Sequence, residues 1–177
     1  MTRYGKEKKR SALDETALRD LALTYVGRFA TSRVKLARYL ERKLVERGWD
    51  GEKSADIESL VTRFSDLGYV DDAGFARMKA ASMERRGLGA RRIGAALRAD
   101  GIGEADRAEA EENVRSGEWH AADIFARRKR IGPYAGEIAD PKLRERQLAA
   151  FLRAGHRMDV ALVWVDAPPG ELPERSE

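Results

Sequence analysis

Cysteine is absent from this chain of 177 residues, and histidine occurs only twice. Without cysteine the protein cannot form disulfides, use a thiol nucleophile, or hold an iron–sulfur cluster or a cysteine-type zinc site. The two histidines, His120 and His156, lie far apart in the sequence and belong to no HExxH motif. We therefore expect a protein without a metal centre.

Long apolar segments are also missing. No run approaches the roughly 18 residues of a membrane-spanning helix, and the basic residues 1–10 lack the apolar stretch of a signal peptide. We expect a cytoplasmic protein with no membrane contact. Aromatic residues make up 7% of the chain and charged residues 36%. This balance favours thin helices with wide solvated faces over one large globule.

Motifs for catalysis and nucleotide binding are missing as well. The phosphate-binding pattern GxxxxGK[ST] does not occur. Gly87-Leu88-Gly89 followed by Gly94 has some likeness to a dinucleotide loop, but Arg92 stands at the third glycine position. Such a loop also follows a strand, whereas the residues before Gly87 have a helical pattern. We interpret these glycines as a tight turn between helices. Since no nucleophile–base pair is recognisable either, the sequence predicts a protein that is not an enzyme and needs no cofactor.

Helical periodicity runs through almost the whole chain. Apolar residues recur at spacings of three and four, and Ser32 and Asp140 are suitable N-caps. Gly48, Gly101 and Gly155 each end the middle helix of a three-helix group, about 53 residues apart. The pattern predicts an all-α fold, an elongated array of three tandem three-helix repeats. The expected organisation is a basic, disordered N-terminus (1–13), repeat 1 (14–68), repeat 2 (69–116), repeat 3 (117–165) and an acidic, disordered tail (166–177).

Clusters of basic residues give the strongest indication of a partner in a chain of net charge +4. A single cluster is commonly just a solvated face, but clusters at related places in successive repeats favour an anionic partner, either a nucleic-acid backbone or an acidic protein groove. The first cluster lies opposite the leucine face of its helix. The three clusters are Lys35, Arg38 and Arg42; Arg85, Arg86, Arg91 and Arg92; and Arg127, Arg128, Lys129 and Arg130.

One segment resembles a known family signature. The run Gly68-Tyr69-Val70-Asp71-Asp72-Ala73-Gly74-Phe75-Ala76 is similar to the G-Y-[LIV]-[ND]-D-x-x-[FY]-A signature of the RecX family. Within it we expect Tyr69 and Phe75 to pack in the core or between units, and the Asp71/Asp72 pair to cap a helix. Further similarities, spread over about 14–165, are Ser32 with Leu36, Leu40 and Leu44, Gly89 to Ile93 with Leu97 and Gly101-Ile102, and the segment Phe151 to His156.

The resemblance also has departures. Lys35 stands where many family members carry an acid, and Ala154 and His156 replace the usual arginine and aromatic residue around Gly155. Contacts with a partner therefore cannot be carried over at these places. The basic N-terminus and the acidic tail lie outside the resemblance.

Membership of this family would imply a modular helical fold and a regulatory role. RecX proteins bind the RecA recombinase, lodge in the groove of the RecA–DNA filament, and restrain filament growth, ATP hydrolysis and strand exchange. The resemblance thus implies two partners, the RecA filament and single- or double-stranded DNA bound without sequence preference. We expect a monomer, because no clear dimerisation element is present.

Two other classes of function stay open on the sequence alone. One is a DNA-binding regulator that acts without RecA, in which residues 90–101 follow the glycine turn as in a helix-turn-helix. The other is an enzyme acting on nucleic acid, which would need paired carboxylates near a basic patch. The acids within 104–112 have instead the pattern of a solvated helix face.

Overall fold

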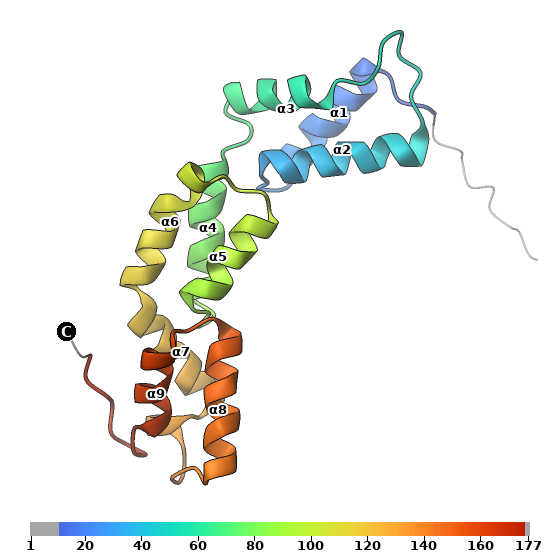
Figure 1. The fold of residues 1–177 in the computed structure, drawn as a ribbon. Coiled ribbons are helices and arrows are strands. Elements are labelled where there is room, and N and C mark those ends of the chain that lie inside the picture. Colours follow the sequence, from blue (N-terminus) through green and yellow to red (C-terminus); the bar gives the residue numbers. More distant parts are fainter. Residues whose placement is uncertain (1–10, 176–177) are drawn as a thin grey trace, which may run out of the picture. The chain divides into compact units, whose positions relative to one another are not determined.

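A computed structural model describes residues 11–175, and throughout this range the regular structure is helical. The chain divides into two compact units, one ending at Asp71 and the other beginning at Asp72. The prediction of an all-α fold is confirmed. None of the helices in the described range is long and apolar enough to cross a membrane. The elements, labelled in Figure 1, are α1 (Glu15–Val26), α2 (Arg33–Arg47), α3 (Ile57–Asp66), α4 (Asp72–Glu84), α5 (Ala90–Ala99), α6 (Glu104–Ser116), α7 (Glu118–Lys129), η1 (Gly132–Tyr134), α8 (Pro141–Ala154) and α9 (Met158–Asp166).

The first unit is a three-helix group whose helix starts are fixed by local capping. Asp14, Ser32 and Asp56 precede α1, α2 and α3, and each side chain accepts a hydrogen bond from a backbone N–H three residues later, at 2.8, 3.2 and 2.9 Å. The bond from Ser59 N–H to Asp56 also lowers the pKa of that carboxyl, since it favours the charged form. The apolar stripes of the three helices then meet in one core, formed by Leu13, Leu18, Ala22, Leu36, Leu40, Val61, Phe64 and Val70.

An isolated parallel bridge closes this unit. Leu13 N–H donates to the Gly48 carbonyl at 2.9 Å, and Asp50 N–H donates to the Leu13 carbonyl at 2.7 Å. Leu13 is fully buried, although it falls within the N-terminal stretch expected to be disordered. The rest of that stretch, up to residue 10, lies outside the described residues.

The second unit holds two three-helix groups in succession. Helices α4, α5 and α6 pack on one another, and α7 and α8 both border α9 (Figure 1). The first group buries Phe75, Ile93 and Leu97, while the second buries Phe125, Phe151 and Trp164. Leu88, in the turn between α4 and α5, packs against both cores. The turn is therefore the joint between the two groups.

The three glycines singled out by spacing end corresponding helices. Gly48 and Gly155 directly follow α2 and α8, and Gly101 follows α5 after one further residue. Their φ angles are +83°, +96° and +75°, in the left-handed region where only glycine lies without strain. The shared geometry fits a repeated three-helix plan, although the exact repeat boundaries remain a prediction.

The Gly68–Ala76 segment differs in part from expectation. Phe75 is buried, but Tyr69 is 53% exposed, so of the two expected places the core is wrong for Tyr69. Its ring lies against that of Phe64, with 5.5 Å between the centroids, and leaves the rest of the side chain in solvent. Helix α4 begins at Asp72, which is buried, and Asp71 stands just before it.

The described part of the acidic tail makes specific contacts. Asp166 ends α9 and forms an ion pair with Arg144 of α8 at 2.6 Å. This pair lowers the pKa of the Asp166 carboxyl, mainly through the hydrogen bond from Arg144. Beyond it, residues 167–175 form no helix, and Gly170 N–H donates to the Pro133 carbonyl at 2.9 Å.

Candidate partner-binding surfaces

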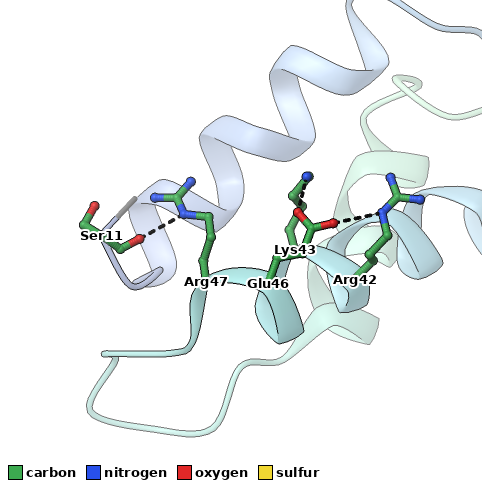
Figure 2. Close-up of polar contacts among 5 residues, drawn as sticks. All are labelled: Ser11, Arg42, Lys43, Glu46 and Arg47. Carbon is green, nitrogen blue, oxygen red and sulfur yellow. Dashed lines mark hydrogen bonds and ion pairs between the residues drawn. The ribbon is translucent and has the colours of Figure 1, made fainter. Parts of the chain in front are cut away.

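Helix α2 carries the first predicted cluster on the side away from its buried leucines. Leu36 and Leu40 are fully buried, whereas Arg38 and Arg42 are exposed and Lys35 is half-buried. Figure 2 shows Arg42 and Lys43 reaching the same carboxylate, that of Glu46, with 3.5 Å between Arg42 Nε and Glu46 Oε1. Exposed ion pairs of this kind contribute little stability. Arg42 can therefore exchange Glu46 for an anionic partner.

Aromatic rings accompany the cations of α2, which the sequence reading missed. Tyr39 stacks on Tyr25 of α1 with 4.1 Å between the ring centroids. The Arg42 guanidinium lies 5.6 Å from the centre of the Tyr39 ring, and the Lys43 ammonium 5.8 Å. The spacing of three and four residues between Tyr39 and these cations was the available signal. At the end of α2, Arg47 donates to the Ser11 carbonyl at 2.9 Å (Figure 2).

The glycine turn that carries the second cluster is a site of very close backbone approach. Gly89 N–H donates to the Ala154 carbonyl at 2.9 Å, and Arg91 N–H donates to the Gly155 carbonyl at 3.1 Å. A β-carbon on Gly87 would lie 2.8 Å from the backbone nitrogen of Phe125 in α7. The interpretation as a tight interhelical turn is confirmed, and the glycines also let α4, α5, α7 and α8 meet.

This contact sets the electrostatics of α5. Arg91 and Arg92 lie in its first turn, where the helix dipole disfavours positive charge. The Ala154 and Gly155 carbonyls at the end of α8 already accept hydrogen bonds from the Gly89 and Arg91 N–H groups, so these two N–H groups are not available to an anion. An anionic partner at this place has to be held by the guanidinium groups themselves.

The joint brings the second and third clusters onto one surface. Arg128 Nη1 donates to the Arg86 carbonyl at 2.6 Å, and Arg92 Nη1 donates to the Arg153 carbonyl at 3.0 Å. Arg153 is exposed and was absent from the predicted set, because only folding places the end of α8 beside α5. We call Arg85, Arg86, Arg91, Arg92, Arg128 and Arg153 the arginine surface.

The charges of the arginine surface are not neutralised within the unit. Across the described residues, none of its six side chains forms an ion pair with a carboxylate. Lys129 and Arg130 continue from Arg128 and are exposed as well. Arg130 ends α7 with a φ of +55°, which is rare for a residue with a side chain. This unpaired positive charge is the main feature that could attract an anionic partner.

Arg127 belongs to a different group from the rest of its cluster. Its guanidinium lies 3.2 Å from the Tyr134 hydroxyl and 3.7 Å from Asp123. The hydrogen bond with Tyr134 and the nearby Asp123 carboxylate raise the pKa of Arg127. Burial, followed by the hydrogen bond to Asp123, raises the pKa of Tyr134. Arg127 thus stabilises the α7–η1 corner.

His156 is a buried polar residue at the joint. Its Nε2 lies 3.0 Å from the Gly87 carbonyl oxygen, and its ring packs against those of Phe125 and Phe151, which also contact each other. Because a carbonyl only accepts, Nε2 carries the proton, and Nδ1 has no hydrogen-bond partner in the described structure. Burial lowers the pKa of His156, although the bond to Gly87 acts in the opposite direction. The sequence marked this position only as a departure from the family pattern.

Several acids of α6 are engaged with arginines. Glu109 pairs with Arg77 of α4 at 2.9 Å, and Glu111 lies 3.0 Å from Arg107 and 3.7 Å from Arg98. Within 11–175, no group of three or more histidine, aspartate or glutamate side chains is placed to hold a metal ion. Two of these contacts link α6 to α4 and α5, and the third lies within α6.

Comparisons with known proteins agree with this architecture. No family model matches the chain. The regulatory protein RecX of Myxococcus xanthus (strain DK1622) is 33% identical over 171 residues, which cover 92% of this chain and 91% of that protein.

Solved structures show the same fold at lower identity. A crystal structure of regulatory protein RecX has a TM-score of 0.60 and 15% identity, over 82% of this chain and 68% of the other. A crystal structure of RecX from Lactobacillus salivarius has a TM-score of 0.62 and 16% identity, over 82% and 90%. With one-third of its residues identical to a RecX protein over nearly the full length of both, this chain belongs to the RecX family of regulatory proteins.

Proposed function

We propose that this protein binds the filament of the RecA recombinase on DNA and restrains its ATP hydrolysis, growth and strand exchange. The single observation that carries the proposal beyond family membership is the arginine surface, six exposed cations with no carboxylate partner in the described chain. A RecA–DNA filament presents DNA phosphates and protein surface together. A positively charged regulator can use both.

The arginine surface is suited to a partner larger than a small anion. Two of its guanidiniums are held in place by backbone carbonyls, at 2.6 and 3.0 Å, so less side-chain entropy is lost when they bind. Its cations come from the turn after α4 and from α5, α7 and α8, and they therefore cover several elements. Because a filament repeats the same surface, contacts with neighbouring subunits add through effective concentration. Bridging neighbours would hinder the rearrangements that hydrolysis and strand exchange require.

DNA binding in this proposal is independent of sequence. Guanidinium groups at helix ends meet phosphates, which carry no base information. A helix-turn-helix would instead present the first residues of α5 to base edges. Here the start of α5 abuts Gly155, with a 3.1 Å bond from Arg91 N–H, which disfavours that alternative. We further propose that the protein acts as a monomer in the cytoplasm and has no catalytic turnover.

The test is a titration of the purified protein into a RecA ATPase assay on single-stranded DNA. We expect inhibition by the unmodified chain and weaker inhibition by the double variant Arg85→Ala/Arg91→Ala. The matched control is Arg77→Ala/Arg98→Ala, which removes the same charge from α4 and α5 at residues that face the acids of α6. Unchanged ATPase and strand exchange at a several-fold excess of folded protein in low salt would overturn the proposal.

A further inference from the structure

An open pocket of about 420 Å³ lies in the second unit, apart from the arginine surface. It is bounded by the end of α6, the start of α7 and the start of α9, and Arg175 reaches it from the tail. We propose that this pocket binds one unpaired nucleotide of single-stranded DNA. The inference rests on the proposed function only in taking DNA as a partner.

The apolar wall of the pocket offers a stacking face. Trp119 lines it together with Val160 and Val163 of α9. The Trp119 indole rests on the buried Trp164, with 5.3 Å between the ring centroids and 49° between the planes. Trp119 is half-buried and Val163 is 36% exposed, so this wall packs against the core on one side and faces solvent on the other. Such a supported indole is a platform on which a base of any sequence can stack.

A buried carboxylate lies in the same pocket. Glu118 is only 7% exposed, and its Oε1 accepts a hydrogen bond from Arg157 N–H at the start of α9, at 3.1 Å. Within the described residues its Oε2 has no hydrogen-bond partner, and it is not among the atoms sealed from solvent. This oxygen is therefore open to accept a hydrogen bond from a bound molecule. The amino and imino groups on the edges of unpaired bases are donors of this kind.

Cations surround these two features. Arg115, Arg157 and Arg175 line the pocket. Arg115 pairs with Glu112, and Arg157 pairs with Asp159 at 3.1 Å. All four of these side chains are more than half exposed, so the pairs are weak and can be exchanged for a phosphate.

The combination fits a nucleotide better than an acidic peptide. A stacking face, an acceptor for base-edge donors and cations for phosphate match the three parts of one nucleotide. An acidic peptide would satisfy the arginines but would bring more negative charge to Glu118. In a duplex both faces of each base are stacked and its Watson–Crick edge is paired, so the pocket selects single strands, whereas the arginine surface binds phosphates of either form.

The test uses tryptophan fluorescence of the full chain carrying Trp49→Phe, which removes the tryptophan of the first unit. The probes are a single-stranded oligonucleotide, the same sequence as a duplex, and polyglutamate. We expect quenching by the single strand alone, and an affinity for it at least about fivefold above that for the duplex, as stacking of one base provides. Trp119→Leu should remove this preference.

A second variant tests the inference even if Trp119→Leu fails to fold. Val163→Glu adds a negative charge to the open wall without touching the buried Trp164, and it should also abolish the preference while circular dichroism stays unchanged. Equal quenching by the duplex, stronger quenching by polyglutamate, or a preference that survives Val163→Glu would overturn the inference. RecA ATPase inhibition measured on the same variants tests the proposed function separately, because the arginine surface is intact in them.

Discussion

Gly89 and Gly155 approach each other so closely that a β-carbon on Gly89 would lie 2.4 Å from the carbonyl carbon of Gly155. The reverse is also true, since a β-carbon on Gly155 would lie 2.4 Å from the Arg92 backbone nitrogen. The end of α8 thereby meets the start of α5, and the α8 carbonyls bind the α5 N–H groups. The two helix dipoles run head to tail across this joint, which is favourable.

Gly89→Ala should therefore destabilise the second unit. Gly89 has a φ of −83°, which alanine adopts freely, so the effect comes from the clash with backbone alone. Overpacking of this kind costs about 1–3 kcal/mol. Urea unfolding followed by tryptophan fluorescence would measure the loss. Gly103→Ala is the control, because its β-carbon would make only an ordinary 3.5 Å contact; equal losses in the two variants would contradict the prediction.

His156 should make the stability of the second unit depend on pH. Burial lowers its pKa in the folded state below the ordinary 6.5, so the unfolded chain takes up the proton first. The contribution of His156 to the free energy of unfolding should be complete above about pH 6.5. It should fall as the pH drops towards the folded pKa, by at most ~1.4 kcal/mol per pH unit.

The measurement is a set of urea unfolding curves between pH 7 and pH 5. His156→Phe should abolish this slope, while substitution of the exposed His120 by Asn should preserve it. A slope that persists in His156→Phe would assign the pH dependence to other groups.

The two aromatic residues of the Gly68–Ala76 segment should differ in their effect on stability. Phe75 is buried in the core of α4, α5 and α6, so Phe75→Ala should cost about 3–5 kcal/mol. Tyr69 is about half exposed, and its ring contacts that of Phe64. Tyr69→Ala should therefore lower the free energy of unfolding by only about 1 kcal/mol. Thermal unfolding by circular dichroism would rank them, and a larger loss for Tyr69→Ala would refute the assignment.

Binding to duplex DNA should weaken steeply with salt. If the arginine surface neutralises about four phosphates, the slope of log K against log salt should be about −3.6. Arg85→Ala/Arg91→Ala removes two exposed cations whose side chains form no hydrogen bond or ion pair within residues 11–175, and it should flatten the slope to about −1.8. Fluorescence anisotropy at several salt concentrations would show this. Arg77→Ala/Arg98→Ala should leave the slope unchanged. A flat slope in the unmodified protein would mean that the cations of the arginine surface are solvated and bind no phosphate.

Local chemistry made many of the helix ends predictable. Ser32 and Asp140 cap α2 and α8, and Gly48 and Gly155 end the same helices, because caps and left-handed glycines act within one turn of the chain. The place of Tyr69 outside the core has a non-local cause. The sequence indicates that Tyr69 follows the end of a helix. How much of its ring is covered depends on the folded structure, in which it contacts Phe64 of α3.

The sequence by itself determined the helical class, the helix limits and the family signature, since periodicity, capping and glycine placement are read within short stretches. Tertiary structure alone decided which cations share a surface. Arg128 and Arg86 meet although 42 positions separate them, and Arg92 and Arg153 meet across 61. It also placed Glu118 beside Arg157 N–H and buried His156 under Gly87. Such contacts depend on how whole helices pack, because burial and long-range hydrogen bonds form only when distant segments are brought together.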